Sequence, residues 1–181
     1  LNNNNLEFFR NEYSIECRQV NLADYDYEIG LEDFDIVVSA VPGHMGYRVL
    51  EKVIRAKKNC VDISFFPEDY SSLQELAIEN DVTVIIDCGV APGMSNLILG
   101  RENAEFDIHE FKFYVGGLPQ ERILPFEYKA PFSPSDVIEE YTRPVRMRFG
   151  GEDVITEPLT ELEEVEIPEI GILEGFNTDG L

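Results

Sequence analysis

A carboxylate, proline and two glycines gather at residues 87–93, directly after an apolar run at 82–86. The run has the composition of a buried strand, and residues 94–100 suit a helix. Such a turn places free backbone N–H groups and the positive end of a helix dipole beside a ligand. It is equally compatible with an ordinary strand-to-helix connection.

A second turn of similar character, residues 39–43, ends the apolar run 34–38 and is a weak signal by itself. The carboxyl ends of parallel strands form the ligand crevice of an open α/β sheet. We therefore expect the tips after Val41 and Asp87 to lie side by side on neighbouring strands. The corner Gly116-Gly117 is expected to close over them, which makes a dinucleotide or similar molecule the leading ligand.

The phosphate-binding fingerprint G-x-G-x-x-G does not follow any strand-like run of this sequence. Residues 43–46 have glycines at the wrong spacing. Because the chain begins at Leu1 rather than at a methionine, we expect the pyrophosphate loop to lie upstream of it. Residues 1–181 alone are accordingly expected to bind the cofactor weakly or not at all.

Polar candidates for substrate binding follow in the second half of the chain. Gly116 and Gly117 permit close approach of the backbone, and Lys129 can bind a carboxylate or simply be solvated. Arg143 can clamp a carboxylate with two parallel hydrogen bonds, or it can pair with a glutamate of the preceding helical turn.

Two aspartates stand at or near strand ends, Asp62 and Asp87. A carboxyl group there can act as an acid or base if its pKa is raised, although most such aspartates cap backbone N–H groups. We select Asp87 for a charge-orienting or acid–base role.

The elements that position these residues alternate in the first half of the chain. Strand-like runs and amphipathic helices succeed one another with short connections, which indicates a doubly wound, Rossmann-like parallel sheet. The expected strands are 14–20, 34–42, 60–63 and 82–86. The expected helices are 46–58 and 71–80, the second capped by Ser71 or Ser72. Strand 34–42 is expected to be buried on both faces.

After residue 100 the pattern changes to that of a smaller α+β domain with a mixed or antiparallel sheet. Residues 110–115 alternate strictly, as a half-buried strand does, and 126–129 are a further candidate. A helix is expected over 135–141. Gly150-Gly151 predicts a hairpin between 145–149 and 154–155. We divide the chain into a partial dinucleotide-binding domain, 1–100, and an incomplete substrate and dimerisation domain, 101–181.

Composition excludes several classes of function. A net charge of −22 disfavours binding to nucleic acid and to anionic membranes, and no run is long and apolar enough to cross a bilayer. The three cysteines show no C-x-x-C spacing, which favours buried, reduced thiols in a cytoplasmic protein. His44 and His109 have no partners at metal-ligand spacing, so no metal site is expected.

Taken together, these elements resemble the saccharopine dehydrogenase-like family, and within it the L-lysine 6-dehydrogenase branch. The resemblance covers most of the chain and rests on the order and spacing of several motifs. These motifs are 35–42, 87–100, 116–119, 128–129, 140–144 and 174–181.

The resemblance implies a homodimeric, NAD- or NADP-dependent oxidoreductase that acts at a C–N bond of an amino acid. It places the nicotinamide side of the cofactor against Ser39, Ala40, Val41, Pro42, Cys88, Gly89, Ala91 and Pro92. It places the substrate against Gly116, Gly117, Lys129 and Arg143.

Two departures from the family pattern bear on the substrate. Saccharopine reductases carry an aspartate and a cysteine where this chain has Ala91 and Val115. The differences argue for a lysine-type rather than a saccharopine-type substrate. A dinucleotide-binding regulatory or assembly module without catalysis, and a carboxy-polyamine reductase, are the alternatives.

Overall fold

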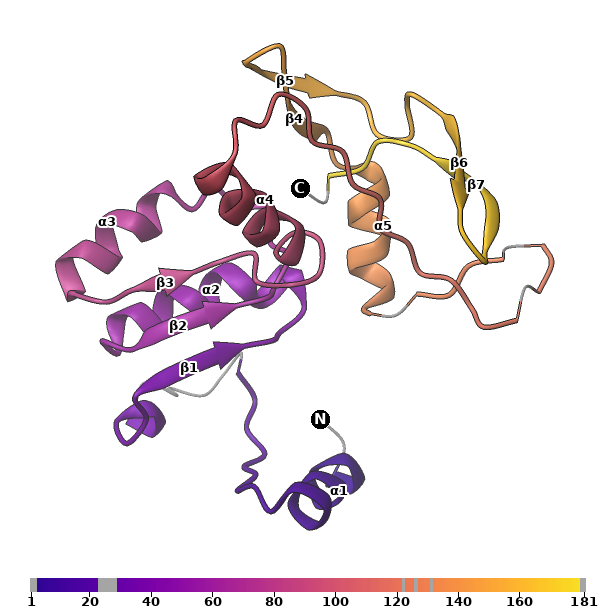
Figure 1. The fold of residues 1–181 in the computed structure, drawn as a ribbon. Helices are drawn as coiled ribbons and strands as arrows, with labels where there is room; N and C mark the ends of the chain where they lie inside the picture. The colour runs from indigo at the N-terminus through magenta and orange to yellow at the C-terminus, as the bar shows by residue number, and fades with distance from the viewer. Residues whose placement is uncertain (1–2, 23–28, 122, 126, 131, 180–181) are drawn as a thin grey trace.

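The computed structural model of the chain describes residues 3–22, 29–121, 123–125, 127–130 and 132–179 (Figure 1). A parallel sheet with helices is followed by small antiparallel sheets, as the sequence predicts. None of the helices in these described ranges is long and apolar enough to cross a membrane. Within the same ranges, no three His, Cys, Asp or Glu side chains gather in a way that could hold a metal ion.

The parallel sheet contains β1 (Ile36–Ser39), β2 (Asn59–Asp62) and β3 (Val84–Ile85), in the order β1-β2-β3. Helices α2 (Gly43–Arg55) and α3 (Ser71–Asn80) connect successive strands and pack against each other. The bounds of α3 are those predicted. Its first turn, however, is fixed by Asp69, whose carboxylate accepts hydrogen bonds from the N–H and the hydroxyl of Ser71.

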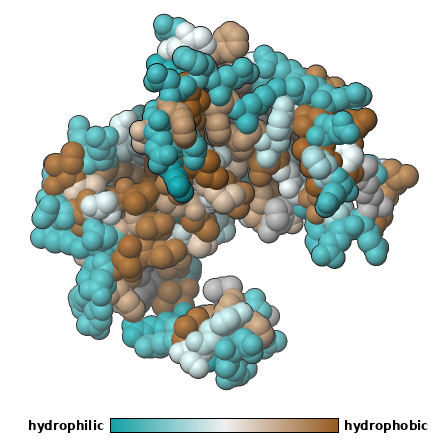
Figure 2. Space-filling view, in the orientation of Figure 1, coloured by the Kyte–Doolittle hydropathy of each residue, from teal (hydrophilic) through white to brown (hydrophobic). Residues whose placement is uncertain are grey.

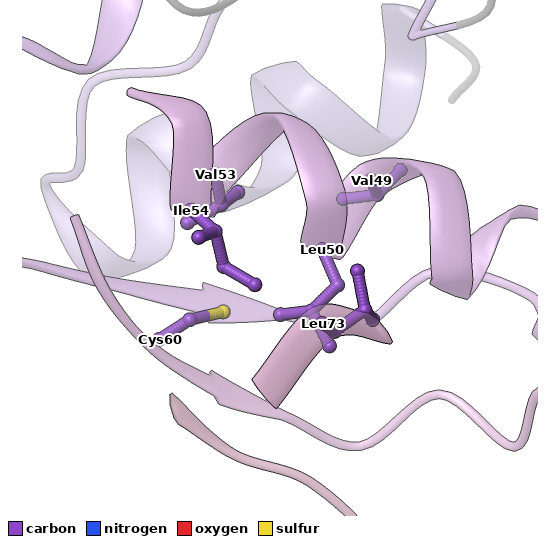
Figure 3. Packing of buried hydrophobic residues seen from close by; sticks show 6 residues of the cluster. All are labelled: Val49, Leu50, Val53, Ile54, Cys60 and Leu73. Atoms are coloured by element: carbon purple, nitrogen blue, oxygen red, sulfur yellow. The ribbon is translucent and has the colours of Figure 1, made fainter. Parts of the chain in front are cut away.

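The core of this half lies between α2, α3 and β2 (Figure 3). Helix α2 buries four apolar side chains on one face because they recur at helical spacing, and Cys60 of β2 and Leu73 of α3 complete the cluster. Leu50 and Ile54 have no exposed surface. Burial of one such side chain contributes about 1.5–3 kcal/mol relative to leaving it in water.

The opposite face of the sheet is open, which corrects the expectation that strand 34–42 is buried on both faces. Ile36 and Val38 of β1 are 54% and 68% exposed, and Ile85 of β3 is 49% exposed. Figure 2 shows apolar side chains gathered over the sheet on the side that faces the viewer. The prediction was wrong because the apolar composition of a strand does not show whether another element covers both of its faces.

Two predicted strands are absent from the described structure. Residues 14–20 belong to no strand, and they follow a helix that was not expected, α1 (Asn3–Tyr13). Residues 110–115 form no strand either. A strand requires a neighbour for its backbone N–H and C=O groups, and alternation in the sequence does not supply one. Phe126 of the candidate strand 126–129 lies outside the described residues, and 127–129 are not a strand.

The domain boundary expected between residues 100 and 101 falls inside helix α4 (Met94–Glu105). The division of the chain into two domains stays a prediction. Helix α5 (Pro134–Thr142) starts after Ser133 and is one residue longer at each end than predicted. The predicted hairpin is confirmed as β4 (Val145–Phe149) and β5 (Glu152–Thr156). A second hairpin, β6 (Glu163–Ile167) and β7 (Gly171–Gly175), was not predicted.

Candidate functional site

The carboxyl ends of the three parallel strands form the floor of the candidate site. Strand β2 lies between β1 and β3, so the tips after Val41 and Asp87 are not on neighbouring strands as expected. Asp62, at the end of β2, separates them. The N–H of Ile63 donates to the carbonyl of Ser39 at 3.0 Å, and the N–H of Cys88 donates to the carbonyl of Asp62 at 3.0 Å.

Asp62 is the most buried polar group at these strand ends, with no exposed surface. Its Oδ2 accepts hydrogen bonds from the N–H of Ser64 at 3.2 Å and from the Ser64 hydroxyl at 2.5 Å. Its Oδ1, and the hydroxyl of the registered neighbour Ser39, have no hydrogen-bond partner among the described residues. Burial is the main cause that raises the pKa of Asp62 above its usual value.

Asp87 lies beyond the end of β3 in the left-handed region, with φ of 55°, a conformation that aspartate tolerates better than most residues. Partial desolvation raises the pKa of its carboxyl group, and the positive charge of Arg146 opposes that rise. The negative charges of Asp62 and Asp179 add to it. Asp87 is therefore a carboxyl group with a raised pKa at a ligand-facing turn.

The turn after Asp87 can be formed only with glycine at its last position. Gly93 has φ of 139°, and a Cβ there would lie 2.2 Å from the carbonyl oxygen of Gly89. The N–H of Met94 donates to that same carbonyl at 2.9 Å, and the amide side chain of Asn96 accepts from the N–H of Gly93 at 3.0 Å. The turn is thereby closed onto the first residues of α4.

The start of α2 is packed tightly against the loop that follows β2. A Cβ on Gly43 would lie 2.1 Å from the carbonyl oxygen of Phe65, and one on Gly46 would lie 2.2 Å from the hydroxyl oxygen of Ser64. The N–H of Gly43 donates to a carboxylate oxygen of Asp136, from α5, at 3.3 Å. The N-terminus of α2 is thus already occupied by a negative charge.

Arg143 also joins the second half to this loop. Its guanidinium lies over the ring of Phe65 at 4.2 Å from the ring centroid and donates to the Phe65 carbonyl at 3.3 Å. It also pairs with Glu139 at 3.0 Å, and its side chain is only 12% exposed. The structure therefore brings Arg143 close to the strand ends, but in contact with protein groups.

The other predicted substrate residues are placed less centrally. Gly117 accepts a hydrogen bond from the N–H of Lys129 at 3.1 Å, so this corner and Lys129 are neighbours. The side chain of Lys129 is exposed. Val115, directly before the corner, lines an apolar cavity of about 270 Å³ together with Val90 and Met94. The corner thus approaches the 87–93 turn through this cavity, whereas within the described residues no polar contact of Lys129 with the strand ends is seen.

Arg146 and Asp179 are the residues that sequence reasoning missed. Arg146 is the second residue of β4, and its Nε and Nη2 lie 3.3 and 3.5 Å from the carboxylate oxygens of Asp179. Apolar and basic residues alternate along 145–149, but alternation does not say what the basic face approaches.

A parallel sheet with connecting helices, whose strand ends carry small residues and glycine turns, defines a Rossmann-like α/β protein. The family model for the saccharopine dehydrogenase NADP binding domain matches residues 3–85, and the model for the saccharopine dehydrogenase C-terminal domain matches residues 89–181. The chain belongs to the saccharopine dehydrogenase family. The family's first domain is described as NADP binding, in agreement with the expected nicotinamide cofactor.

Curated relatives agree with this placement. The chain is 26% identical over 125 residues to an alpha-aminoadipic semialdehyde synthase of Arabidopsis thaliana, covering 65% of this chain and 12% of that protein. It is 27% identical over 115 residues to a saccharopine dehydrogenase [NADP(+), L-glutamate-forming] of Saccharomyces cerevisiae, covering 60% and 26%. The enzyme of the same name from Pyricularia oryzae is 29% identical over 111 residues, covering 58% and 25%.

The fold is shared with a solved structure, apo saccharopine dehydrogenase (L-Glu forming) from Saccharomyces cerevisiae. The TM-score is 0.68 at 19% sequence identity, and the match covers 97% of this chain and 42% of that one. The chain spans between 12% and 26% of the length of the curated relatives it matches. The narrower placement in the lysine dehydrogenase branch stays a prediction.

Proposed function

We propose that this chain is part of an NAD(P)-dependent oxidoreductase that acts at a C–N bond of an amino acid. The observation that carries the proposal is the pair of carboxyl groups, Asp62 and Asp87, whose pKa values are both raised at adjoining parallel strand ends. Raised-pKa carboxyl groups concentrate at functional sites. Membership in the saccharopine dehydrogenase family supports the reaction class.

The turns fit the nicotinamide end of the cofactor better than its pyrophosphate. The hydroxyl of Ser39 is buried and makes no hydrogen bond of good geometry with a described residue, and it is followed by alanine, valine and proline, which add no charge. The residues that would hold this end are Ser39, Ala40, Val41, Pro42, Cys88, Gly89, Ala91 and Pro92. The N-terminus of α2 would repel a phosphate, because the carboxylate of Asp136 already accepts from the N–H of Gly43.

A nicotinamide accepts or donates the hydride in such a reaction. The contribution of this chain is to orient the substrate amine and to remove its proton, because only a neutral amine can lose hydride from the adjacent carbon. We assign that role to Asp87, because its raised pKa increases its affinity for a proton. We also propose that Gly116, Gly117, Lys129 and Arg143 face the substrate.

The substrate class is proposed on narrower grounds. Ala91 and Val115 replace the aspartate and cysteine of saccharopine reductases, and Val115 belongs to the apolar cavity beside the 87–93 turn. An apolar wall at this point favours a lysine-type substrate over the larger, more acidic saccharopine. A homodimer is proposed from the resemblance alone, and a cytoplasmic location from the cysteine spacing.

A substrate screen tests this proposal. The protein is given NAD or NADP with lysine, saccharopine, other amino acids or carboxy-polyamines, and cofactor reduction is followed by absorbance. Asp87→Asn should lower kcat by about 10²–10⁴-fold, the usual contribution of a general base. Asp153→Asn, at an exposed position of β5, is the matched control and should leave kcat unchanged.

The screen also separates the alternatives. Cofactor binding, followed by fluorescence, without turnover of any amine would favour a regulatory or assembly module. Turnover of carboxy-polyamines alone would favour the polyamine reductase. Full activity in Asp87→Asn would remove Asp87 from the proton-transfer role.

A further inference from the structure

Arg146 is an exposed cation held in place by a buried partner. Its side chain is 67% exposed, whereas that of Asp179 is only 5% exposed. The Nε and Nη2 groups face the two carboxylate oxygens of Asp179 at 3.3 and 3.5 Å. This side-on geometry orients the plane of the guanidinium and leaves Nη1 outside the ion pair.

The segment that carries Asp179 is itself fixed to α5. The hydroxyl of Thr178 donates to a carboxylate oxygen of Glu140 at 3.4 Å, and the ring of Phe176 packs edge-on against Tyr141 with centroids 5.8 Å apart. On the Arg146 side of the ion pair, the neighbouring Val145 is 1% exposed and anchors the start of β4. Both ends of the ion pair therefore rest on packed structure.

The charge of Arg146 reaches the strand ends. Arg146 is the group that lowers the pKa of Asp87 against its desolvation, and the charge of Asp179 is also felt there. Arg146 is thus the cation of the second half that acts on Asp87, beside the carboxyl groups of Asp62 and Asp179. A zwitterionic amino acid has the complementary arrangement, with its carboxylate toward Arg146 and its amino group toward Asp87.

The other cations of the second half are less suited to the role. Arg143 stacks on Phe65 and is only 12% exposed. Arg148, on the same strand as Arg146, pairs with Asp153 where both side chains are largely exposed. A net charge of −22 repels the carboxylate group of a substrate, so a site that binds this group requires a local cation.

We propose that Arg146, oriented by Asp179, is the residue that binds the carboxylate of the amino-acid substrate opposite Asp87. The inference rests on the proposed function for its substrate class and assigns a role that sequence reasoning gave to Arg143. Asp179 is a positioning residue, since it acts through Arg146.

The test compares an amino acid with the amine that lacks its carboxylate. L-Lysine and 1,5-diaminopentane are titrated into the protein, and binding is followed by NMR shifts of the backbone amides of 87–93, with KM and kcat measured alongside. Arg146→Ala should weaken lysine binding tenfold or more, because a hydrogen-bonded charge is lost, and should leave diamine binding within twofold. Arg148→Ala is the matched control and should change neither.

Two further variants keep the inference testable if Arg146→Ala is poorly folded. Asp179→Asn should weaken lysine binding by releasing the guanidinium, and Arg146→Lys should restore part of it because the charge is kept. Arg146→Ala should also raise the pKa of Asp87, measured by carboxyl ¹³C titration. Equal effects of Arg146→Ala and Arg148→Ala, or equal loss of lysine and diamine, would overturn the inference.

Failure of the inference and failure of the proposed function give different results. If lysine is oxidised equally well by Arg146→Ala and by the unmodified protein, the inference is wrong and the proposed function stands. If lysine binding depends on Arg146 but no amine is oxidised, the inference stands without the catalytic proposal. Absence of any lysine binding to the unmodified protein counts against the inference.

Discussion

Gly46 offers a sharp test of the packing beneath the strand ends. It lies in the first turn of α2, and its hydrogen atoms face the loop after β2. A Cβ there would lie 2.2 Å from the Ser64 hydroxyl oxygen, 2.8 Å from the Ser64 Cβ and 2.9 Å from a ring carbon of Phe66. The hydroxyl could rotate away, but the Ser64 Cβ can move only with its backbone.

The expected effect of Gly46→Ala is the sum of opposing contributions. Alanine gains about 0.5–1 kcal/mol in helix propensity over glycine. Overpacking of a tight contact costs about 1–3 kcal/mol. Displacing Ser64 also weakens its hydrogen bond to the Asp62 carboxylate, a bond to a charged group that is worth about 1.5–3 kcal/mol. We therefore expect a net destabilisation of about 2 kcal/mol or more.

Gly100 is the matched control, because it lies in α4 and a Cβ there would meet nothing within 4 Å. Gly100→Ala should stabilise the protein by about 0.5–1 kcal/mol from propensity alone. Urea unfolding followed by far-UV circular dichroism measures both variants. The reasoning would be refuted if Gly46→Ala were as stable as Gly100→Ala, since the close approach of α2 to Ser64 would then not exist.

Two further perturbations address the core and the buried carboxyl group. Leu50→Ala should cost about 2–5 kcal/mol in unfolding free energy, because Leu50 has no exposed surface; a urea midpoint unchanged from that of the unmodified protein would contradict the cluster around α2. Asp62 has a raised pKa, so above its usual value of 3.8 the folded state holds a proton that the unfolded chain has released. Stability should then fall as the pH rises through this window, and the contribution is lost above the raised pKa. Asp62→Asn should flatten the dependence of stability on pH and raise stability at neutral pH. Unfolding curves between about pH 4 and pH 8 measure this, and an unchanged slope would contradict the raised pKa of Asp62.

Local patterns allowed several elements to be predicted from the sequence. The helix 71–80 and the hairpin around Gly150-Gly151 depend on residues that are close in the chain, and both were found as expected. Glycine at 150 and 151 adopts φ of 60° and 88°, which the turn requires. Such features need no knowledge of what packs against them.

Features that depend on distant partners were not predictable. Residues 110–115 alternate like a strand, yet Lys112 and Tyr114 bind Glu163 of β6 through their side chains rather than through a backbone ladder. The site shows the same limit. Arg143 and Arg146 are three residues apart and of the same type. Arg143 directly follows α5 and stacks on Phe65, whereas Arg146 lies in β4 and pairs with Asp179.

Helix α5 has a mechanical consequence for the site. Asp136 near its start and Arg143 directly after its end both attach to the first half, at Gly43 and at Phe65. Nine helical residues span about 13 Å and resist compression. The helix therefore acts as a spacer of fixed length. It sets the distance between the carboxyl groups at the strand ends and the hairpin that follows α5.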